Sequence, residues 1–150
     1  MSIEIDKIDR EILRELLSGA RKSYREIARK VGVTTTTVIK RVAKLKKEKA
    51  IKGDTVILDP EKLGFSFTVM IEIIFSKGRL LETEETIAKH YNVFAVYDLT
   101  GERDAVILAR FRDRAELNAF VKNLLKNPSV ERTNTHIVLN TIKEDWRVPV

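Results

Sequence analysis

The segment from Ser23 to Leu45 constrains the fold of this chain more than any other stretch. Its sequence is SYREIARKVGVTTTTVIKRVAKL. Ser23 and Glu26 have the spacing of a capping box, which predicts that a helix starts there. Gly32 favours the left-handed conformation that ends helices, and Thr34 is then placed to cap a second helix. The buried side of this second helix is predicted to consist of Val38, Val42 and Leu45.

Two helices joined by a short glycine turn are typical of the helix-turn-helix unit, whose second helix enters the DNA major groove. The distribution of charge agrees with this interpretation. Residues 20–52 carry 12 Lys and Arg against 2 Asp and Glu, whereas residues 60–150 carry 13 of each sign. A basic excess confined to the helical segment favours binding to phosphates of double-stranded DNA, although Lys-rich helix faces are also common as plain solvated surface.

Composition excludes several other classes of protein. The chain has 150 residues and no cysteine, which excludes disulfides and thiolate chemistry. No apolar run approaches the roughly 20 residues of a membrane span, and the first residues lack the pattern of a signal peptide. We therefore expect a cytoplasmic protein without a membrane segment. No metal-ligand spacing or glycine-rich phosphate loop is evident, so no cofactor is expected.

The first half of the chain is predicted to form one small helical domain. Residues 9–17 have apolar side chains on one stripe and form a further helix before the helix-turn-helix pair. After the pair, two short extended pieces around Gly53 and Asp54 predict a hairpin, or wing, whose Lys52 would reach the DNA backbone. We place a DNA-binding domain at 1–53, a linker at 54–64 and a second domain at 65–150.

In the second domain the hydrophobic period changes from that of helices to that of strands. Apolar residues alternate over 65–76, which predicts a strand. A helix over 80–91, with Leu80, Ile87 and Tyr91 on one side, strands over 93–99 and 104–111, a second helix and a last strand over 130–142 follow. The inner side of that second helix would consist of Leu117, Phe120, Val121, Leu124 and Leu125. This βαββαβ order is the ferredoxin-like arrangement, so the fold class is α+β, with a winged helix-turn-helix followed by a ferredoxin-like domain.

The ferredoxin-like arrangement leaves one face of its sheet uncovered by helices. The first strand is apolar on both sides, with Phe67, Val69, Ile71 and Ile73 on one side and Met70 and Ile74 on the other. A second copy of the same sheet would cover this face and form a homodimer. The alternative is that the N-terminal helices of the same chain cover it.

The chain resembles the leucine-responsive/asparagine-regulator (Lrp/AsnC) family of prokaryotic transcription factors over nearly its full length. The resemblance is carried by the order and spacing of several segments. These are DKIDREILRELL, ARKSYREIARKVGV, TxTxVxxRVxKL, LDPEKLG, the GxxD of Gly101–Asp104 and the TxTxIVL of Thr133–Leu139. It implies dimers through the C-terminal sheets, with assembly into tetramers or octamers in part of the family, and paired helix-turn-helix units on pseudo-palindromic operators.

For DNA binding we expect Thr35 and Thr36, near the start of the second helix of the motif, to contact base edges. Phosphate contacts are expected from basic side chains on this helix and at the start of the preceding one. These are Lys40, Arg41, Lys44, Lys22 and Arg25.

The resemblance also implies a free amino acid as effector, held by the loop between the second and third strands. Here that loop contains Gly101, Glu102, Arg103 and Asp104, with Thr133, Thr135 and His136 as further candidates. A carboxylate would receive the α-amino group, and N–H groups of the glycine turn would hold the α-carboxylate. Arg103 departs from the family pattern, and it would either favour an acidic ligand or fill the pocket with an ion pair. The loop is otherwise an ordinary charged turn.

Two other functions are consistent with the same organisation. An architectural DNA-binding protein would bind duplexes without sequence preference. Sirohaem decarboxylases resemble this two-part architecture too, and Arg132 with His136 on one face of the last strand would be the candidate tetrapyrrole contacts. The basic second helix of the motif favours a DNA-binding protein that is not an enzyme, because a decarboxylase does not need it.

Overall fold

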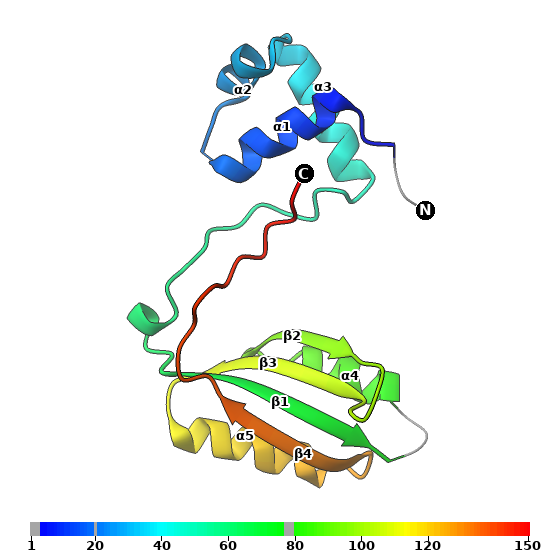
Figure 1. Cartoon of the computed structure of the whole chain (residues 1–150), viewed down its shortest axis with the longest axis vertical. Helices are drawn as coiled ribbons and strands as arrows, with labels where there is room; N and C mark the ends of the chain where they lie inside the picture. Colours follow the sequence, from blue (N-terminus) through cyan, green and yellow to red (C-terminus); the bar gives the residue numbers. More distant parts are fainter. Residues whose placement is uncertain (1–3, 20, 77–79) are drawn as a thin grey trace. The chain divides into compact units, whose positions relative to one another are not determined.

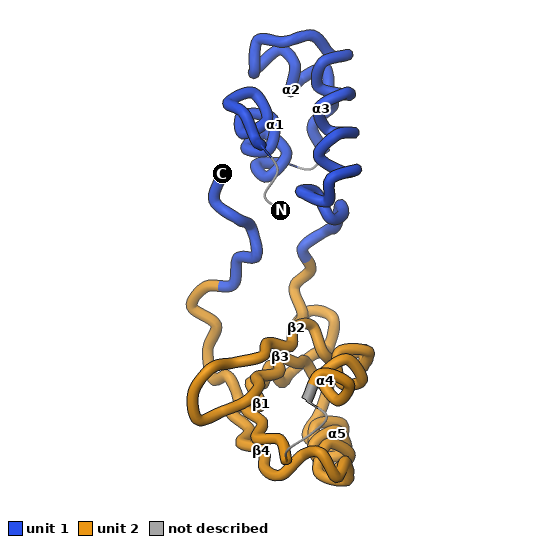
Figure 2. The backbone as a smooth tube through the Cα atoms, turned by 90° about the vertical axis from the view of Figure 1, so that its right-hand side faces the viewer, with its two compact units in different colours: residues 1–57, 144–150 blue, residues 58–143 orange. Residues whose placement is uncertain are grey.

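The structure is a computed structural model that describes residues 4–19, 21–76 and 80–150. The chain forms two compact units, the first from residues 1–57 and 144–150 and the second from residues 58–143 (Figure 1; Figure 2). None of the described helices has the length and apolar content that crossing a bilayer requires.

The first unit contains three helices, α1 (Lys7–Ser18), α2 (Tyr24–Val31) and α3 (Thr35–Lys47). Each begins at a side-chain cap, because the oxygen of Asp6, Ser23 or Thr34 accepts the backbone N–H three residues later. Gly32 ends α2 with φ of 76°, a left-handed conformation that glycine adopts without strain. The capping and termination predicted from the sequence are confirmed.

The core of the helical unit joins one apolar stripe from each helix. Ile12 of α1, Ile27 of α2 and Val38 of α3 are fully buried and belong to one hydrophobic cluster. Val42 and Leu45 continue the buried side of α3, as predicted. Burying these side chains provides most of the free energy that fixes a small three-helix unit, since isolated helices of this length are marginal in water.

The predicted wing is wrong. The described residues between α3 and Glu61 contain no strand. Ile51 packs against the helical core and Asp54 accepts from Lys46 Nζ at 2.7 Å, so this stretch is attached to α3. Val56 and Ile57 that follow are exposed, since no neighbouring strand pairs with them.

The second unit is a four-stranded antiparallel sheet with two helices and a short 3-10 turn. The bounds are η1 Glu61–Leu63, β1 Phe67–Phe75, α4 Leu80–Ala88, β2 Val93–Asp98, β3 Ala105–Phe111, α5 Arg114–Lys126 and β4 Val130–Ile137. The strand order is β2-β3-β1-β4, and both helices lie on the same side of the sheet (Figure 2). The βαββαβ prediction is confirmed.

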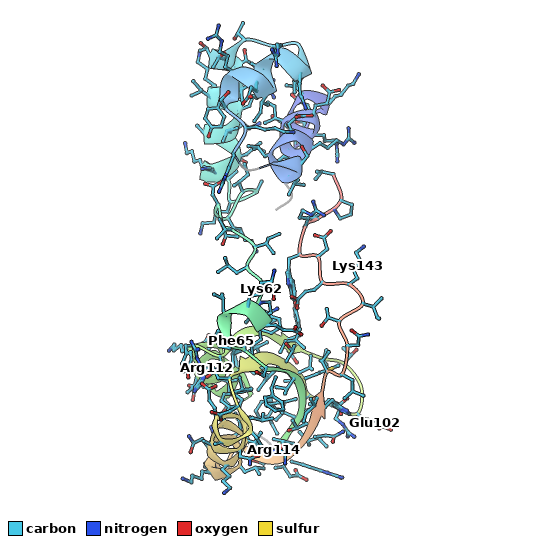
Figure 3. All side chains as sticks on the ribbon, turned by 90° about the vertical axis from the view of Figure 1, so that its left-hand side faces the viewer. Lys62, Phe65, Glu102, Arg112, Arg114 and Lys143 are labelled. Atoms are coloured by element: carbon cyan, nitrogen blue, oxygen red, sulfur yellow. The ribbon has the colours of Figure 1, made fainter. Side chains whose placement is uncertain are left out.

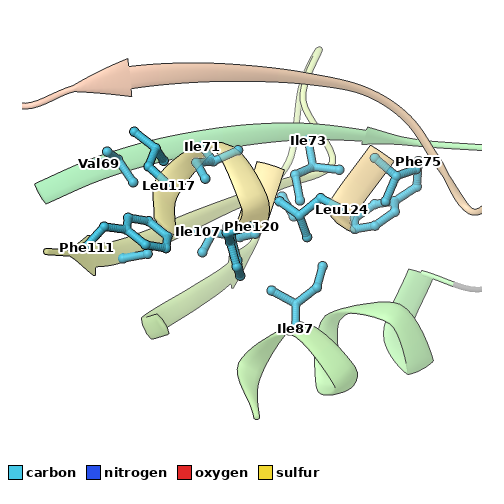
Figure 4. Packing of buried hydrophobic residues seen from close by; sticks show 13 residues of the cluster. Val69, Ile71, Ile73, Phe75, Ile87, Ile107, Phe111, Leu117, Phe120 and Leu124 are labelled. Carbon is cyan, nitrogen blue, oxygen red and sulfur yellow. The ribbon is translucent and has the colours of Figure 1, made fainter. Parts of the chain in front are cut away.

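The core of this unit lies between the sheet and its helices. The inward side of β1 places Val69, Ile71 and Ile73 opposite Leu117, Phe120 and Leu124 of α5, with Ile87 of α4 beside them (Figure 4). Register follows from this burial, because a shift by one residue would turn the apolar side of β1 toward solvent. Where β3 ends, the guanidinium of Arg112 lies 4.8 Å from the ring centre of Phe65 and donates to the carbonyl of Leu63 at 3.3 Å (Figure 3).

Three details differ from the prediction. The last strand ends at Ile137 rather than at residue 142, since Ile137 pairs with Val69 and β1 offers only Thr68 O for Val138 N beyond it. Helix α4 ends at Ala88, so Tyr91 is 75% exposed rather than inward. The predicted inward position of Leu80 lies outside the described side chains. Leu125 is 51% exposed, because α5 contacts the sheet through a narrower stripe.

Candidate nucleic-acid interface and ligand loop

The four consecutive threonines at the start of α3 divide into two pairs. Thr34 Oγ1 accepts the N–H of Thr37 at 3.1 Å, and the two hydroxyls lie 2.9 Å apart. Their hydrogen-bonding groups therefore serve the cap of the helix. Thr35 and Thr36 on the first turn of α3 are exposed, whereas the hydroxyl of Thr34, which is also exposed, bonds to Thr37.

The outward side of α3 is basic. Lys40 and Lys44 are exposed, one turn apart, and α3 contains no acidic residue. Arg25 is exposed on the first turn of α2. A charged group at the end of a long, exposed side chain can reach a phosphate while the helix stays in place. These three side chains therefore have the placement that phosphate contacts need.

Lys22 has partners within the helical unit. Its Nζ donates to Glu15 Oε2 at 2.6 Å and to Ser18 Oγ at 2.5 Å. Lys30 shares the same carboxylate at 3.1 Å. The hydrogen bond to Glu15 raises the pKa of the Lys22 ammonium, and the bonds from Lys22 and Lys30 lower the pKa of Glu15. Binding of a phosphate by Lys22 would therefore compete with these contacts.

Arg41 lies on the side of α3 that faces α1. Its guanidinium donates to the carboxylates of Asp6 and Asp9, the second of which is only 1% exposed. The bond to Asp6 is the main cause that raises the pKa of Arg41. The structure thus places Arg41 in an ion pair between two helices, while its predicted phosphate contact stays a prediction.

The loop between β2 and β3 is fastened at its C-terminal end. Asp104 Oδ2 accepts the N–H of Phe75 at 2.7 Å, and Asp104 N donates to the carbonyl of Ile73 at 3.0 Å. Across the loop, Leu99 N donates to Asp104 O at 2.7 Å. Gly101 has φ of 115°, which only glycine adopts readily, and Glu102 extends outward at the sheet edge (Figure 3).

Arg103 belongs to a polar cluster on the sheet face opposite the helices. We call Glu72, Arg103, Asn134 and His136 the Glu72 cluster. Glu72 Oε2 accepts from Arg103 Nε at 3.3 Å and Asn134 Nδ2 at 3.2 Å, and it lies 3.4 Å from His136 Nε2. Hydrogen bonds from Asn134, His136 and Arg103, in that order, lower the pKa of the Glu72 carboxyl.

Glu72 and Asn134 were not predicted as site residues. The available signal was that Glu72 is the single charged residue within a strand of otherwise apolar and hydroxyl side chains. Thr133 and Thr135 pair with Ile73 and Ile71, so they lie on the helix-covered face, the opposite face from His136. The structure therefore brings Arg103 and His136 together and separates the two threonines from them.

Comparison with known proteins matches the two units to two family models. The model of the AsnC-type helix-turn-helix domain matches residues 5–46, and that of the Lrp/AsnC ligand binding domain matches residues 68–148. The chain belongs to the Lrp/AsnC family of transcriptional regulators. All seven predicted DNA contacts fall within the first match, and the seven predicted effector contacts, His136 included, fall within the second.

Relatives of this Lrp/AsnC chain are similar over almost their whole length. An uncharacterised HTH-type transcriptional regulator of Pyrococcus furiosus is 44% identical, over 97% of this chain and 99% of that protein. The HTH-type transcriptional regulator FL11 of Pyrococcus horikoshii is 35% identical, over 100% and 99%. Among solved structures, AsnC of E. coli has a TM-score of 0.88 at 28% identity, over 98% of this chain and 100% of that one.

Another structural neighbour shows the shared fold alone. The transcriptional regulator NMB0573 of Neisseria meningitidis, solved as a complex with L-Met, has a TM-score of 0.88 at 24% identity, over 97% of both chains. Within the described part of this Lrp/AsnC chain, no group of three or more His, Asp or Glu side chains is arranged to hold a metal ion.

Proposed function

We propose that this regulator recognises specific duplex sequences through the outward side of α3. The observation that carries the proposal is the exposed surface of α3, which combines Thr35 and Thr36 at its start with Lys40 and Lys44 on the following turns. The threonines would contact base edges in the major groove, and the lysines together with Arg25 would contact phosphates. Such a protein would act in the cytoplasm, where prokaryotic DNA is found.

The two remaining basic candidates for phosphate contact have partners within the helical unit. Lys22 and Arg41 already neutralise carboxylates within the helical unit. We expect them to contribute less to phosphate binding than Lys40 and Lys44, because a phosphate would have to compete with existing ion pairs. Arg41 would act mainly through the position of α3.

We further propose that two copies associate through the open face of the sheet. Met70 is 39% exposed and Tyr97 45% exposed there, and Leu108, which pairs with Met70, lies on β3, the strand between theirs. Burial of these side chains against a second copy would remove apolar surface from water. Dimerisation would also supply two α3 helices for a two-fold symmetric operator, and further association into tetramers or octamers would extend that arrangement.

For the effector we propose a free amino acid bound beside the β2–β3 loop. The family model for this unit describes a ligand binding domain, which supports a small-molecule site in residues 68–148. Glu102 is exposed and would receive the α-amino group. The ion pair of Arg103 with Glu72 supports the interpretation that Arg103 shapes the pocket wall, with Thr133 and Thr135 remaining as weaker candidates.

The test is a titration of the purified protein against its own upstream DNA and a scrambled duplex of equal length, over a range of salt concentrations. Preference for the upstream duplex would support sequence-specific regulation. Equal and salt-sensitive binding to both would favour the architectural alternative or a regulator of other genes. Free amino acids, L-methionine among them, are then added, and Arg103→Ala is expected to alter the response to the effector without altering affinity in its absence.

We also propose that the chain is not an enzyme. His136, the residue that a tetrapyrrole site would need, is engaged with Glu72 and Asn134 on an exposed strand. A purified protein that is colourless after incubation with sirohaem and removal of the unbound pigment would be consistent with a regulator. Conversion of sirohaem by the protein would overturn this part of the proposal.

A further inference from the structure

One apolar side chain of α3 faces solvent. Ile39 is 49% exposed, whereas the other large apolar residues of α3, which are Val38, Val42 and Leu45, are at most 3% exposed. Burying an aliphatic side chain is favourable in proportion to the area removed from water, so Ile39 retains apolar surface that a partner can cover. Because Ile39 lies on the helix that we propose to bind DNA, we take DNA as the partner that covers it.

Ile39 is part of a row of methyl groups along one side of α3. Residues three and four apart are neighbours on a helix, so Thr35, Thr36 and Ala43 adjoin Ile39. All four are exposed and all carry a methyl group. We call them the methyl row. Arg41, two residues from Ile39, points the other way, since it pairs with Asp6 and Asp9 of α1.

The methyl row is set in a basic surface. Lys40 and Lys44 follow Ile39 and Ala43 directly in the chain, and α3 has no acidic side chain. A basic surface attracts the DNA backbone, but methyl groups gain nothing from phosphates. In the major groove the apolar feature of a base edge is the C5-methyl group of thymine, which alkyl side chains recognise by contact.

We propose that Ile39, together with the methyl groups of Thr35 and Thr36, selects thymine in the DNA bound by this protein. The proposal rests on the proposed function, because it requires α3 to lie in the major groove. Cytosine lacks the methyl group, and guanine and adenine present hydrogen-bonding groups in the major groove that an isoleucine cannot satisfy. Discrimination at this position therefore comes from apolar contact, whereas Lys40 and Lys44 bind all duplexes alike.

The experiment uses a duplex enriched from a random library by repeated selection on the full-length protein. Each thymine is then replaced singly by deoxyuracil, which removes the C5-methyl group and leaves base pairing unchanged. We expect at least one replacement to weaken binding about four-fold, as for loss of one buried methyl group. Ile39→Ala should bind the parent duplex about as weakly and should no longer distinguish thymine from uracil at that position.

Two variants of Thr36 separate methyl contact from hydrogen bonding. Thr36→Val keeps a methyl group and removes the hydroxyl, and Thr36→Ser does the reverse. If methyl contact matters, the serine variant loses sensitivity to uracil at a second position while the valine variant keeps it. Thermal unfolding of each variant checks that the helical unit is intact, which the exposure of these side chains leads us to expect.

The remaining outcomes overturn the inference in distinguishable ways. If the selected duplex binds equally well with uracil at every position, apolar selection of thymine is wrong while sequence-specific binding stands. If the loss with uracil is the same in Ile39→Ala, another residue contacts the methyl group. If the selection enriches no sequence, the proposed function fails as well, and the inference fails with it.

Discussion

The guanidinium of Arg41 donates to both carboxylate oxygens of Asp9 at 3.3 Å, and Asp9 is the most deeply buried charged side chain of the helical unit that the structure describes. This pair joins α3 to α1. A buried carboxylate without its counter-ion is strongly unfavourable, so the pair restricts the orientation of α3 even where its net contribution to stability is small. Asp6, which caps α1, accepts from the same guanidinium.

Arg41→Ala is expected to lower the melting temperature of the helical unit, because it leaves Asp9 buried without a cation. Asp9→Asn should lower the melting temperature less, and the double variant should be no less stable than Arg41→Ala. Thermal unfolding of the parent, the two single variants and the double variant measures the coupling between the two residues. The salt dependence of DNA binding provides the second measurement. For Arg41→Ala we expect an unchanged slope of the logarithm of the binding constant against the logarithm of the salt concentration. A decrease of about 0.9 in the magnitude of this slope would instead assign a phosphate contact to Arg41.

Asp6 makes the stability of the helical unit depend on pH in the acidic range. The backbone N–H of Asp9, followed by Arg41, lowers the pKa of the Asp6 carboxyl below its ordinary value of 3.8. A lowered pKa in the folded state contributes stability above pH 3.8, and this contribution is lost as pH falls through the folded pKa. Asp6→Asn should therefore be less stable than the parent at pH 7 in urea unfolding. A difference that persists undiminished at pH 2 would contradict this.

Glu84 of α4 should make stability depend on pH in the opposite direction. Burial is the first cause that raises its pKa above the ordinary value of 4.5, with Asp98 and Asp104 adding repulsion. Its Oε1 has no hydrogen-bond partner within the described part of the chain. The folded state then binds the proton more tightly, so stability falls as pH rises above 4.5. Glu84→Gln should increase the free energy of unfolding at pH 8 and change it little at pH 4; an equal effect at both would exclude titration of Glu84.

Met70→Asp tests whether the open face of the sheet forms the interface between copies. An aspartate at this position would bring a charge into the apolar interface, so the dissociation constant of the dimer should rise about ten-fold or more. Leu125→Asp is the matched control, since Leu125 is 51% exposed on α5, on the other side of the sheet. Sedimentation velocity over a dilution series measures both. Dissociation caused equally by the two variants would argue against the open face.

The caps and stripes of the helical unit could be predicted from the sequence because they depend on residues three or four apart. Ser23 with Glu26, Gly32 and Thr34 each act locally, and the structure has them as predicted. The alternation that located β1 and the stripe that located α5 are similarly local. Element order then limits the topology of a small sheet to few choices.

What could not be predicted depends on partners distant in the chain. The phosphate contact of Arg41 stays a prediction, but its ion pairs with Asp9 of α1 and the cap residue Asp6, 32 and 35 residues earlier, could not be inferred from local spacing. The ligand contact of Asp104 also stays a prediction, whereas the bond that its carboxylate accepts from Phe75, 29 residues away, could not be inferred from the sequence. The wing failed because Ile51 packs against the helical core and Asp54 accepts from Lys46, so the two extended pieces around Gly53 do not pair with each other.

The hydrogen bonds of Asp104 to β1 also determine how the β2–β3 loop can respond to a ligand. Asp104 attaches the C-terminal end of the loop to Phe75 and Ile73, and Leu99 N bonds back to Asp104, so both ends of the loop are held in place. A ligand bound there would meet a preorganised surface, with a small entropic penalty for ordering. Binding of a ligand would then affect β1 through the hydrogen bonds of Asp104, without closure of the loop over the ligand.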